Sequence, residues 1–267
     1  MKPGLSATLR AVVAAVKLVA AEEIMPRYMK VALQRKSDGS LCTEADLSAQ
    51  EALTRKLQAI VNVPVIGEEM PAEQQRALWA ESNEQGVWCI DPIDGTSNFV
   101  RGLPYFAVSA ALVRGGRSVL GVVYDPAGDE AFAAEAGRGA YLNGEKLVSR
   151  NAAKDLSTAL ANVDMKWIDD KLATRLAVSP PFISQRNFGA SALDWCYTAA
   201  GRYDVYLHGG QMLWDYAAGS LVLQEAGGLV CCLDSDDFCN CDVWRRSVIA
   251  SADPALFEQW KNWVRAQ

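Results

Sequence analysis

The stretch VWCIDPIDGT, residues 87–96, carries the most information about this chain. Its four leading apolar residues predict a short buried strand that ends directly at Asp91. Pro92 fixes its own backbone angle, which spaces Asp91 and Asp94 about one helical turn apart. Both carboxylates can then face one point, with the Ile93 carbonyl between them. Hard oxygen ligands arranged in this way favour a magnesium site.

Two other acidic residues and a phosphate cradle extend this signature. Glu68 comes just after the apolar run 63–66, and Asp215 opens an apolar helical segment far downstream. Carboxylates from several elements can stabilise the attacking and leaving oxygens of an in-line displacement together. Gly95 and Thr96 stand where a chain turning into a helix would offer free N–H groups to phosphate. The pattern predicts phosphoryl chemistry, although Asp215 can equally be the N-cap of its helix, or serve both purposes.

The composition describes a protein with a large core and no basic surface. The chain has 267 residues, half of them hydrophobic, a length at which one core usually splits into two. Its formal net charge of -6 provides no basic stripe, so no direct contact with nucleic acid is expected. A single histidine, His208, speaks against zinc hydrolases and Ser-His-Asp hydrolases.

The N-terminal segment 5–21 is apolar, but Arg10 and Lys17 interrupt it and no small-residue cleavage site follows. Its apolar residues recur at helical spacing, which predicts an amphipathic surface helix that Pro26 closes. No later run approaches the roughly 20 apolar residues that span a bilayer. We therefore expect no membrane association and a cytoplasmic location.

Seven cysteines, an odd number without a secretory signal, predict reduced thiols. Four of them cluster near the C-terminus, at Cys231, Cys232, Cys239 and Cys241. A zinc or redox role is one interpretation, but the cluster lacks the C-x2-C spacing of most zinc sites. The alternative is a buried strand pair followed by a loop.

Turn signals divide the chain into two parts. Three apolar segments separated by turn sequences predict an antiparallel meander: 106–113, 118–124 and 130–135. Beyond about residue 148 strand and helix patterns alternate, which favours an α/β layer structure. We expect an α+β domain over 1–148 with most metal ligands, and an α/β domain over 149–267 with Asp215 and the substrate pocket.

Helical and strand patterns also predict the elements around the acidic signatures. A capping box precedes a helix over about 45–61, and a second helix is expected over 190–202. A third helix begins at Asp215 and ends at the Gly227-Gly228 pair. Strands are expected over 203–207 and 229–232.

Several of these segments together resemble a known family. They are residues 67–69, 91–99, 121–126, 139–144, 186–193, 214–219 and 225–228. They are similar to the inositol monophosphatase family, of the lithium-sensitive, Mg-dependent phosphatase superfamily, and the resemblance covers nearly the whole chain. It implies a layered αβαβα sandwich that forms a homodimer.

The resemblance also implies a set of metal ligands. One Mg2+ would be held by Glu68, Asp91 and the Ile93 carbonyl. A second would be held by Asp91, Asp94 and Asp215. Glu68 would bear on a weaker third ion, which makes two to three ions in all.

The catalytic roles follow from the same resemblance. Asp46 and Thr96 match the pair that orients the attacking water, and Glu68 acts with them. Gly95 and Thr96 supply backbone N–H groups to the phosphate. Lys36 falls in the segment that forms a mobile active-site loop in the family.

The substrate pocket departs from the family pattern. His208 stands where inositol phosphatases usually place a glutamate that accepts hydrogen bonds from hydroxyl groups. A neutral imidazole has one acceptor and one donor, so it favours a ligand with additional negative charge or a base to stack on. Alternatively, His208 merely packs at the edge of the pocket. Ser191 adds a polar contact, and Asp94 and Asp215 also border the substrate.

The expected activity is that of a Mg2+-dependent phosphomonoesterase. Its substrate would be inositol monophosphate or a similar polyol or sugar phosphate, hydrolysed by in-line attack of metal-activated water. The alternatives are 3'-phosphoadenosine 5'-phosphate, fructose 1,6-bisphosphate and histidinol phosphate. From a different class comes a non-catalytic role as a protein partner of RNA-maturation or transcription complexes.

Overall fold

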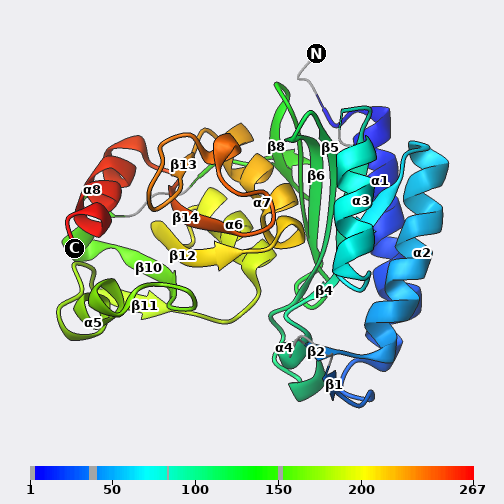
Figure 1. The fold of residues 1–267 in the computed structure, drawn as a ribbon, viewed down its shortest axis with the longest axis horizontal. Coiled ribbons are helices and arrows are strands. Elements are labelled where there is room, and N and C mark those ends of the chain that lie inside the picture. Colours follow the sequence, from blue (N-terminus) through cyan, green and yellow to red (C-terminus); the bar gives the residue numbers. More distant parts are fainter. Residues whose placement is uncertain (1–3, 36–40, 83, 150–152) are drawn as a thin grey trace.

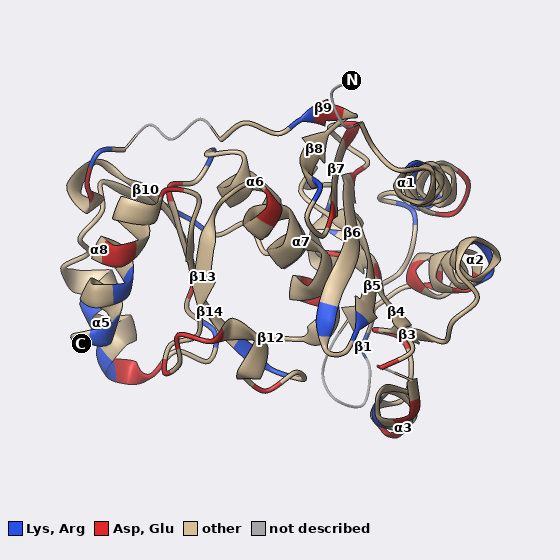
Figure 2. Ribbon diagram, turned by 90° about the horizontal axis from the view of Figure 1, so that it is seen from above, with Lys and Arg blue, Asp and Glu red and all other residues tan. Residues whose placement is uncertain are grey.

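Two β-sheets with helices between and outside them make up the computed structural model, which describes residues 4–35, 41–82, 84–149 and 153–267 (Figure 1). Seen from above, the layers follow one another as helices, sheet, helices, sheet and helices (Figure 2). The layered αβαβα sandwich predicted from the resemblance is therefore confirmed. Within the described residues, no helix combines the length and the apolar character needed to cross a bilayer.

The first sheet has seven strands in the order β3-β4-β5-β6-β7-β8-β9. They are β3 Val65–Gly67, β4 Val87–Asp94, β5 Ala107–Arg114, β6 Arg117–Asp125, β7 Glu130–Glu135, β8 Gly139–Leu142 and β9 Glu145–Lys146. β3 pairs parallel with β4, and every later pair is antiparallel. The predicted meander is thus confirmed, with strand ends within one residue of those expected.

The second sheet has five strands in the order β11-β10-β12-β14-β13. They are β10 Leu160–Asp164, β11 Ser184–Arg186, β12 Val205–Gln211, β13 Leu229–Cys231 and β14 Arg246–Ser251. β10 pairs parallel with β11 and β12, whereas β14 pairs antiparallel with β12 and β13. A two-stranded ribbon, β1 Gln34–Arg35 and β2 Leu41–Cys42, stands apart from both sheets.

Helices form the outer layers and the middle layer of the sandwich. They are α1 Ala7–Val19, α2 Glu44–Ile60, α3 Ala72–Ser82, α4 Thr96–Arg101, α5 Asp170–Val178, α6 Ser191–Ala199, α7 Leu213–Glu225 and α8 Pro254–Arg265. α1 continues as a π-helix over Ala20–Ile24 and a 3-10 turn over Met25–Arg27, so the helical path extends beyond the predicted residue 21. α1 and α2 cover the outer face of the first sheet, and α8 covers the second (Figure 2).

α6 and α7 form the middle layer and join the two sheets. One apolar core combines Phe132 of the first sheet, Trp195 of α6 and Tyr206 of the second sheet, all fully buried. Residue 148 lies between β9 and β10, so each sheet falls on its own side of the expected boundary. The division into two domains at that residue stays a prediction.

The cysteine cluster differs from the expectation. Cys232 and Cys241 are joined by a disulfide, so the prediction of reduced thiols is wrong for this pair. A 3-10 turn over Phe238–Asn240 folds the loop back beside the end of β13, a proximity that no count of cysteines can show. Among the described residues the acidic group below is the sole cluster of potential metal ligands, and it contains no cysteine.

Gly219 of α7 sets how closely α6 and α7 pack. A Cβ atom there would collide with the Trp195 side chain and lie 2.8 Å from its Cγ. We expect Gly219→Ala to lower the free energy of unfolding by about 1–3 kcal/mol, because the helices must separate. Urea unfolding measures this, with Gly4→Ala as control because no atom lies within 4 Å of a Cβ there. Equal stability of Gly219→Ala and wild type would contradict the prediction.

Candidate metal centre

A β-bulge at the end of β4 brings Asp91 and Asp94 together. β4 continues as a strand through Asp94, and its register with β5 shifts between the two aspartates. The predicted helical turn between them is therefore wrong. Residues three apart on a regular strand point to opposite faces, and the extra residue of a bulge removes that opposition. The Ile93 N–H donates to Asp91 Oδ1 at 3.0 Å within this bulge.

Asp215 reaches the same place from the first turn of α7. It is the third helical residue, and the N-cap is Met212, so the N-cap interpretation of Asp215 is wrong. Its Oδ2 nevertheless accepts the Met212 N–H at 2.9 Å, which fixes the carboxylate at the helix start. Carboxylate oxygens of Asp91, Asp94 and Asp215 all lie within 4.8 Å of one another.

Glu68 borders this group of three without belonging to it. It follows β3, and its N–H donates to the Ile90 carbonyl on β4 at 3.2 Å. The side chain lines the same cavity as Asp94 and Asp215. Its charge contributes to raising the pKa of Asp91 and of Asp94. The parallel pairing of β3 and β4 thus places a fourth carboxylate beside the other three.

Burial and mutual repulsion raise the pKa values of these carboxylates. Burial raises the pKa of Asp94 to about 8, against the Ala192 N–H, which donates to its Oδ2 at 2.6 Å. Burial and then Asp94 raise the pKa of Asp215 to about 7. Burial and then Glu68 raise the pKa of Asp91 well above its usual range. Crowded carboxylates in this state take up either protons or a cation, and an all-oxygen donor set fits Mg2+.

Asp46 and Thr96 lie side by side, as the resemblance implied. The Thr96 hydroxyl is 3.5 Å from Asp46 Oδ1 and 3.1 Å from the Ile93 carbonyl oxygen. Burial raises the pKa of Asp46 to about 6, although the Thr43 N–H and hydroxyl donate to its Oδ2 at 2.7 and 2.5 Å. Gly95, with φ of 90°, turns the strand into α4. The Thr96 hydroxyl and the Asp46 carboxylate therefore share one buried position.

A cavity of about 640 Å3 opens over the carboxylates. It is lined by Glu68, Met70, Ala72, Gln75, Asp94, Asp164, Lys166, Trp167, Gly189, Ser191, His208, Gly210, Met212, Trp214, Asp215 and Arg245. Ser191 and His208, both predicted from sequence, are among them. The acidic Asp164 and the basic Lys166 and Arg245 were not predicted. Lys36 lies outside the described residues.

His208 is buried in the cavity wall as a neutral imidazole. Its Nδ1 accepts the Gly210 N–H at 3.0 Å, which leaves the proton on Nε2. Nε2 lies 3.7 Å from Asp164 Oδ2, across the β10–β12 register that pairs these two residues. Burial lowers the pKa of His208 to about 4 despite Asp164. The side chain therefore turns its Nε2–H donor towards the Asp164 carboxylate.

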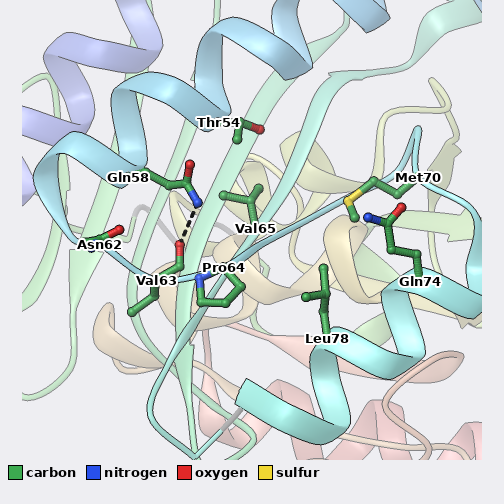
Figure 3. Close-up of a pocket in the computed structure, with 9 residues that line it drawn as sticks. All are labelled: Thr54, Gln58, Asn62, Val63, Pro64, Val65, Met70, Gln74 and Leu78. Carbon is green, nitrogen blue, oxygen red and sulfur yellow. Dashed lines mark hydrogen bonds between the residues drawn. The ribbon is translucent and has the colours of Figure 1, made fainter.

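A second hollow, of about 460 Å3, lies among α2, β3 and α3 (Figure 3). Its lining is Thr54, Gln58, Asn62, Val63, Pro64, Val65, Met70, Gln74 and Leu78. None of these side chains is charged, and the Gln58 amide donates to the Val63 carbonyl at 3.2 Å. This hollow offers no carboxylate for a divalent cation, so the candidate site is the cavity over the carboxylates.

Known proteins share both the sequence and the fold of this chain. It is 37% identical over 241 residues to Nus factor SuhB of Pseudomonas aeruginosa, covering 86% of this chain and 85% of that protein. It is 32% identical to an inositol-1-monophosphatase of Caulobacter vibrioides, covering 88% and 91%. The crystal structure of extragenic suppressor protein suhB from Bartonella henselae superimposes with a TM-score of 0.81 at 27% identity, covering 97% and 99%. The inositol monophosphatase family model matches residues 5–265, and the chain therefore belongs to that family.

Proposed function

We propose that this protein is a Mg2+-dependent phosphomonoesterase that hydrolyses a small phosphate ester. The observation that carries the proposal is the convergence of Asp91, Asp94 and Asp215 within 4.8 Å, with Asp94 and Asp215 in the wall of a cavity of about 640 Å3. Family membership supports the same reaction. The Asp46–Thr96 pair beside the carboxylates supplies the remaining chemistry.

Each carboxylate has a defined part in this proposal. Asp91, Asp94 and Asp215 would hold Mg2+, with Glu68 and the Ile93 carbonyl completing the ligands of two to three ions. When bound, Mg2+ offsets phosphate charge and lowers the pKa of coordinated water.

Asp46 and Thr96 position the attacking water, and the Asp46 carboxylate receives its proton. A carboxylate with a pKa near 6 is a better base at neutral pH than an ordinary aspartate. The Thr43 hydroxyl and N–H hold Asp46 Oδ2, which leaves Oδ1 facing Thr96. Gly95 and Thr96, at the start of α4, direct N–H groups to the phosphate.

The substrate we propose is inositol monophosphate or a related polyol or sugar phosphate, with 3'-phosphoadenosine 5'-phosphate and fructose 1,6-bisphosphate as alternatives. Phosphate release from this panel, with Mg2+ and again with Li+ added, tests the proposal. We expect release that depends on Mg2+ and falls with Li+. Purified protein that releases no phosphate from any of them would overturn it.

A non-catalytic role as a protein partner of an RNA-maturation or transcription complex is the second candidate. The relative named Nus factor SuhB favours it. A complementation assay separates the two: an inactive variant that still supports growth in place of a Nus-factor relative favours the partner role. The acidic net charge favours contact with protein over direct contact with RNA.

The homodimer is proposed from the resemblance, and the cytoplasmic location from the sequence, where no apolar run approaches the length that spans a bilayer. Two exposed apolar side chains, Leu103 and Phe188, belong to segments that Asn98 joins. Its Nδ2 donates to the Phe188 carbonyl, and its backbone carbonyl accepts the Leu103 N–H. A dimer interface there predicts a doubled mass in light scattering, and a monomer would refute it.

The Cys232–Cys241 disulfide speaks against a reducing compartment such as the cytoplasm, and cell fractionation tests the location.

A further inference from the structure

Three side chains at the cavity mouth have no part in the proposed hydrolysis: Lys166, Trp167 and Arg245, here called the cationic rim. Lys166 and Trp167 follow β10, and Arg245 precedes β14. The guanidinium carbon of Arg245 lies 4.7 Å from the centre of the Trp167 ring. Trp167 is 68% exposed, although a tryptophan with no partner would usually be buried.

β12 is shaped to hold the cationic rim close. A Cβ atom at Gly209 would lie 2.6 Å from the Ile168 nitrogen, in the backbone that carries Lys166 and Trp167. A Cβ atom at Gly210 would lie 2.9 Å from Arg245 Cγ and 3.5 Å from Trp167 Cβ. Glycine within a strand commonly marks such a close approach. The rim is therefore part of the cavity wall and has a defined place.

The rim carries more positive charge than the one carboxylate beside it, that of Asp164, can balance. Across the described ranges of the chain, no carboxylate lies within 4.0 Å of Arg245. Lys166 Nζ is 3.8 Å from Asp164 Oδ2, an acid that His208 also faces. Once Mg2+ balances the ligand carboxylates, two cations face one carboxylate in the rest of the cavity.

A neutral polyol makes little use of this wall. Sugar hydroxyls need acceptors as well as donors, and the carboxylate of this wall, Asp164, already faces Lys166 and the Nε2 of His208. Arginine binds carboxylate and phosphate groups through two parallel hydrogen bonds, and its contact with an indole ring holds the guanidinium in place. The chemistry of the rim therefore matches an anion.

We propose that the substrate is a phosphate ester with a second anionic group, a carboxylate or another phosphate, in preference to the ester of a neutral polyol such as inositol monophosphate. Arg245 and Lys166 bind that second group beside Trp167. This inference rests on the proposed phosphatase function and names the substrate class for the same site. The second group lies at the cavity mouth while the ester to be cleaved lies over the carboxylates. Specificity then arises in the second sheet, away from the metal ligands of the first.

Matched substrate pairs test the inference. 2-Phosphoglycerate differs from glycerol 2-phosphate by a carboxylate, and fructose 1,6-bisphosphate differs from fructose 1-phosphate by a phosphate. In at least one pair, we expect wild-type kcat/KM to be at least about tenfold higher for the ester with the second anionic group, mainly through a lower KM. Arg245→Gln should lower that ratio about tenfold, and Lys166→Gln should lower it less, because Asp164 already shares its charge.

Arg76 provides the matched control. Its guanidinium carbon lies 5.9 Å from the Trp244 ring, and it does not line the cavity. Arg76→Gln therefore removes the same charge and the same kind of ring contact, and the ratio should stay at the wild-type value. Phosphate release without a preference for either anionic member would overturn the inference alone, as would an Arg245→Gln effect equal for both members. Release from inositol monophosphate but from none of these four esters would overturn the inference alone. Absence of release from the four esters and from inositol monophosphate would overturn the proposed function, and the inference with it.

Discussion

Asp94→Asn is expected to lower kcat at least about 100-fold at saturating Mg2+ while the protein stays folded. The substitution removes one negative ligand from the group formed with Asp91 and Asp215. It keeps an oxygen that can accept the Ala192 N–H, now 2.6 Å from Asp94 Oδ2. Phosphate release measures the activity, and circular dichroism measures the fold.

Asp125→Asn is the control for this experiment. Asp125 is also a buried aspartate, and its Oδ1 accepts two backbone N–H groups, from Ala127 at 2.9 Å and Gly128 at 3.0 Å. It lies at the end of β6, outside the cavity lining. We expect activity near that of wild type for Asp125→Asn. Near-normal activity of Asp94→Asn at saturating Mg2+ would refute the assignment of the metal centre.

The metal-free protein is expected to lose stability as the pH rises from 6.5 to 8.5. The folded pKa values of Asp215 and Asp194, both about 7, and of Asp94, about 8, lie above the 3.8 of an unperturbed aspartate. Over this range the folded protein therefore binds protons that the unfolded chain does not, so raising the pH favours unfolding. The loss should be about 3 kcal/mol, or several degrees in Tm, measured by thermal unfolding in EDTA.

The titration of His208 does not contribute between pH 6.5 and 8.5. The pKa of His208 is lowered to about 4, so His208 acts in the opposite direction, but only below the ordinary histidine value of 6.5. Mg2+ should raise Tm more at pH 8.5 than at pH 6.5, because it binds the ionised carboxylates. Asp94→Asn, without one of the titrating carboxylates, should show a shallower decline in EDTA. A metal-free Tm that rises with pH would contradict the account.

Local sequence was enough to predict the first sheet and the acidic cluster. β7 was predicted at its observed ends, because its alternation lies between turn-forming pairs on both sides. Glu68 and Asp91 were found because each follows an apolar run that forms a buried strand. Such signals lie within one segment and do not depend on the tertiary contacts of that segment.

Features that depend on pairing or on weak patterns were not predictable in this way. The bulge between Asp91 and Asp94 exists only in the register of β4 with β5. α3 has no apolar stripe, since Gln75 is its one buried residue, so helical spacing gave no signal there. Lys166 and Arg245 are far apart in sequence and meet only because β10, β12 and β14 are neighbours in the second sheet.

The position of the cationic rim on the second sheet has a consequence for how this protein can diverge. Asp91 and Asp94 belong to β4 of the first sheet, whereas Lys166 and Arg245 stand in loops next to β10 and β14. Asp215 lies on α7, in the middle layer between the two sheets. Substitutions in those loops can therefore accumulate while the hydrolytic machinery stays intact. Substrate specificity can therefore change from one phosphate ester to another in few substitutions, without an inactive intermediate.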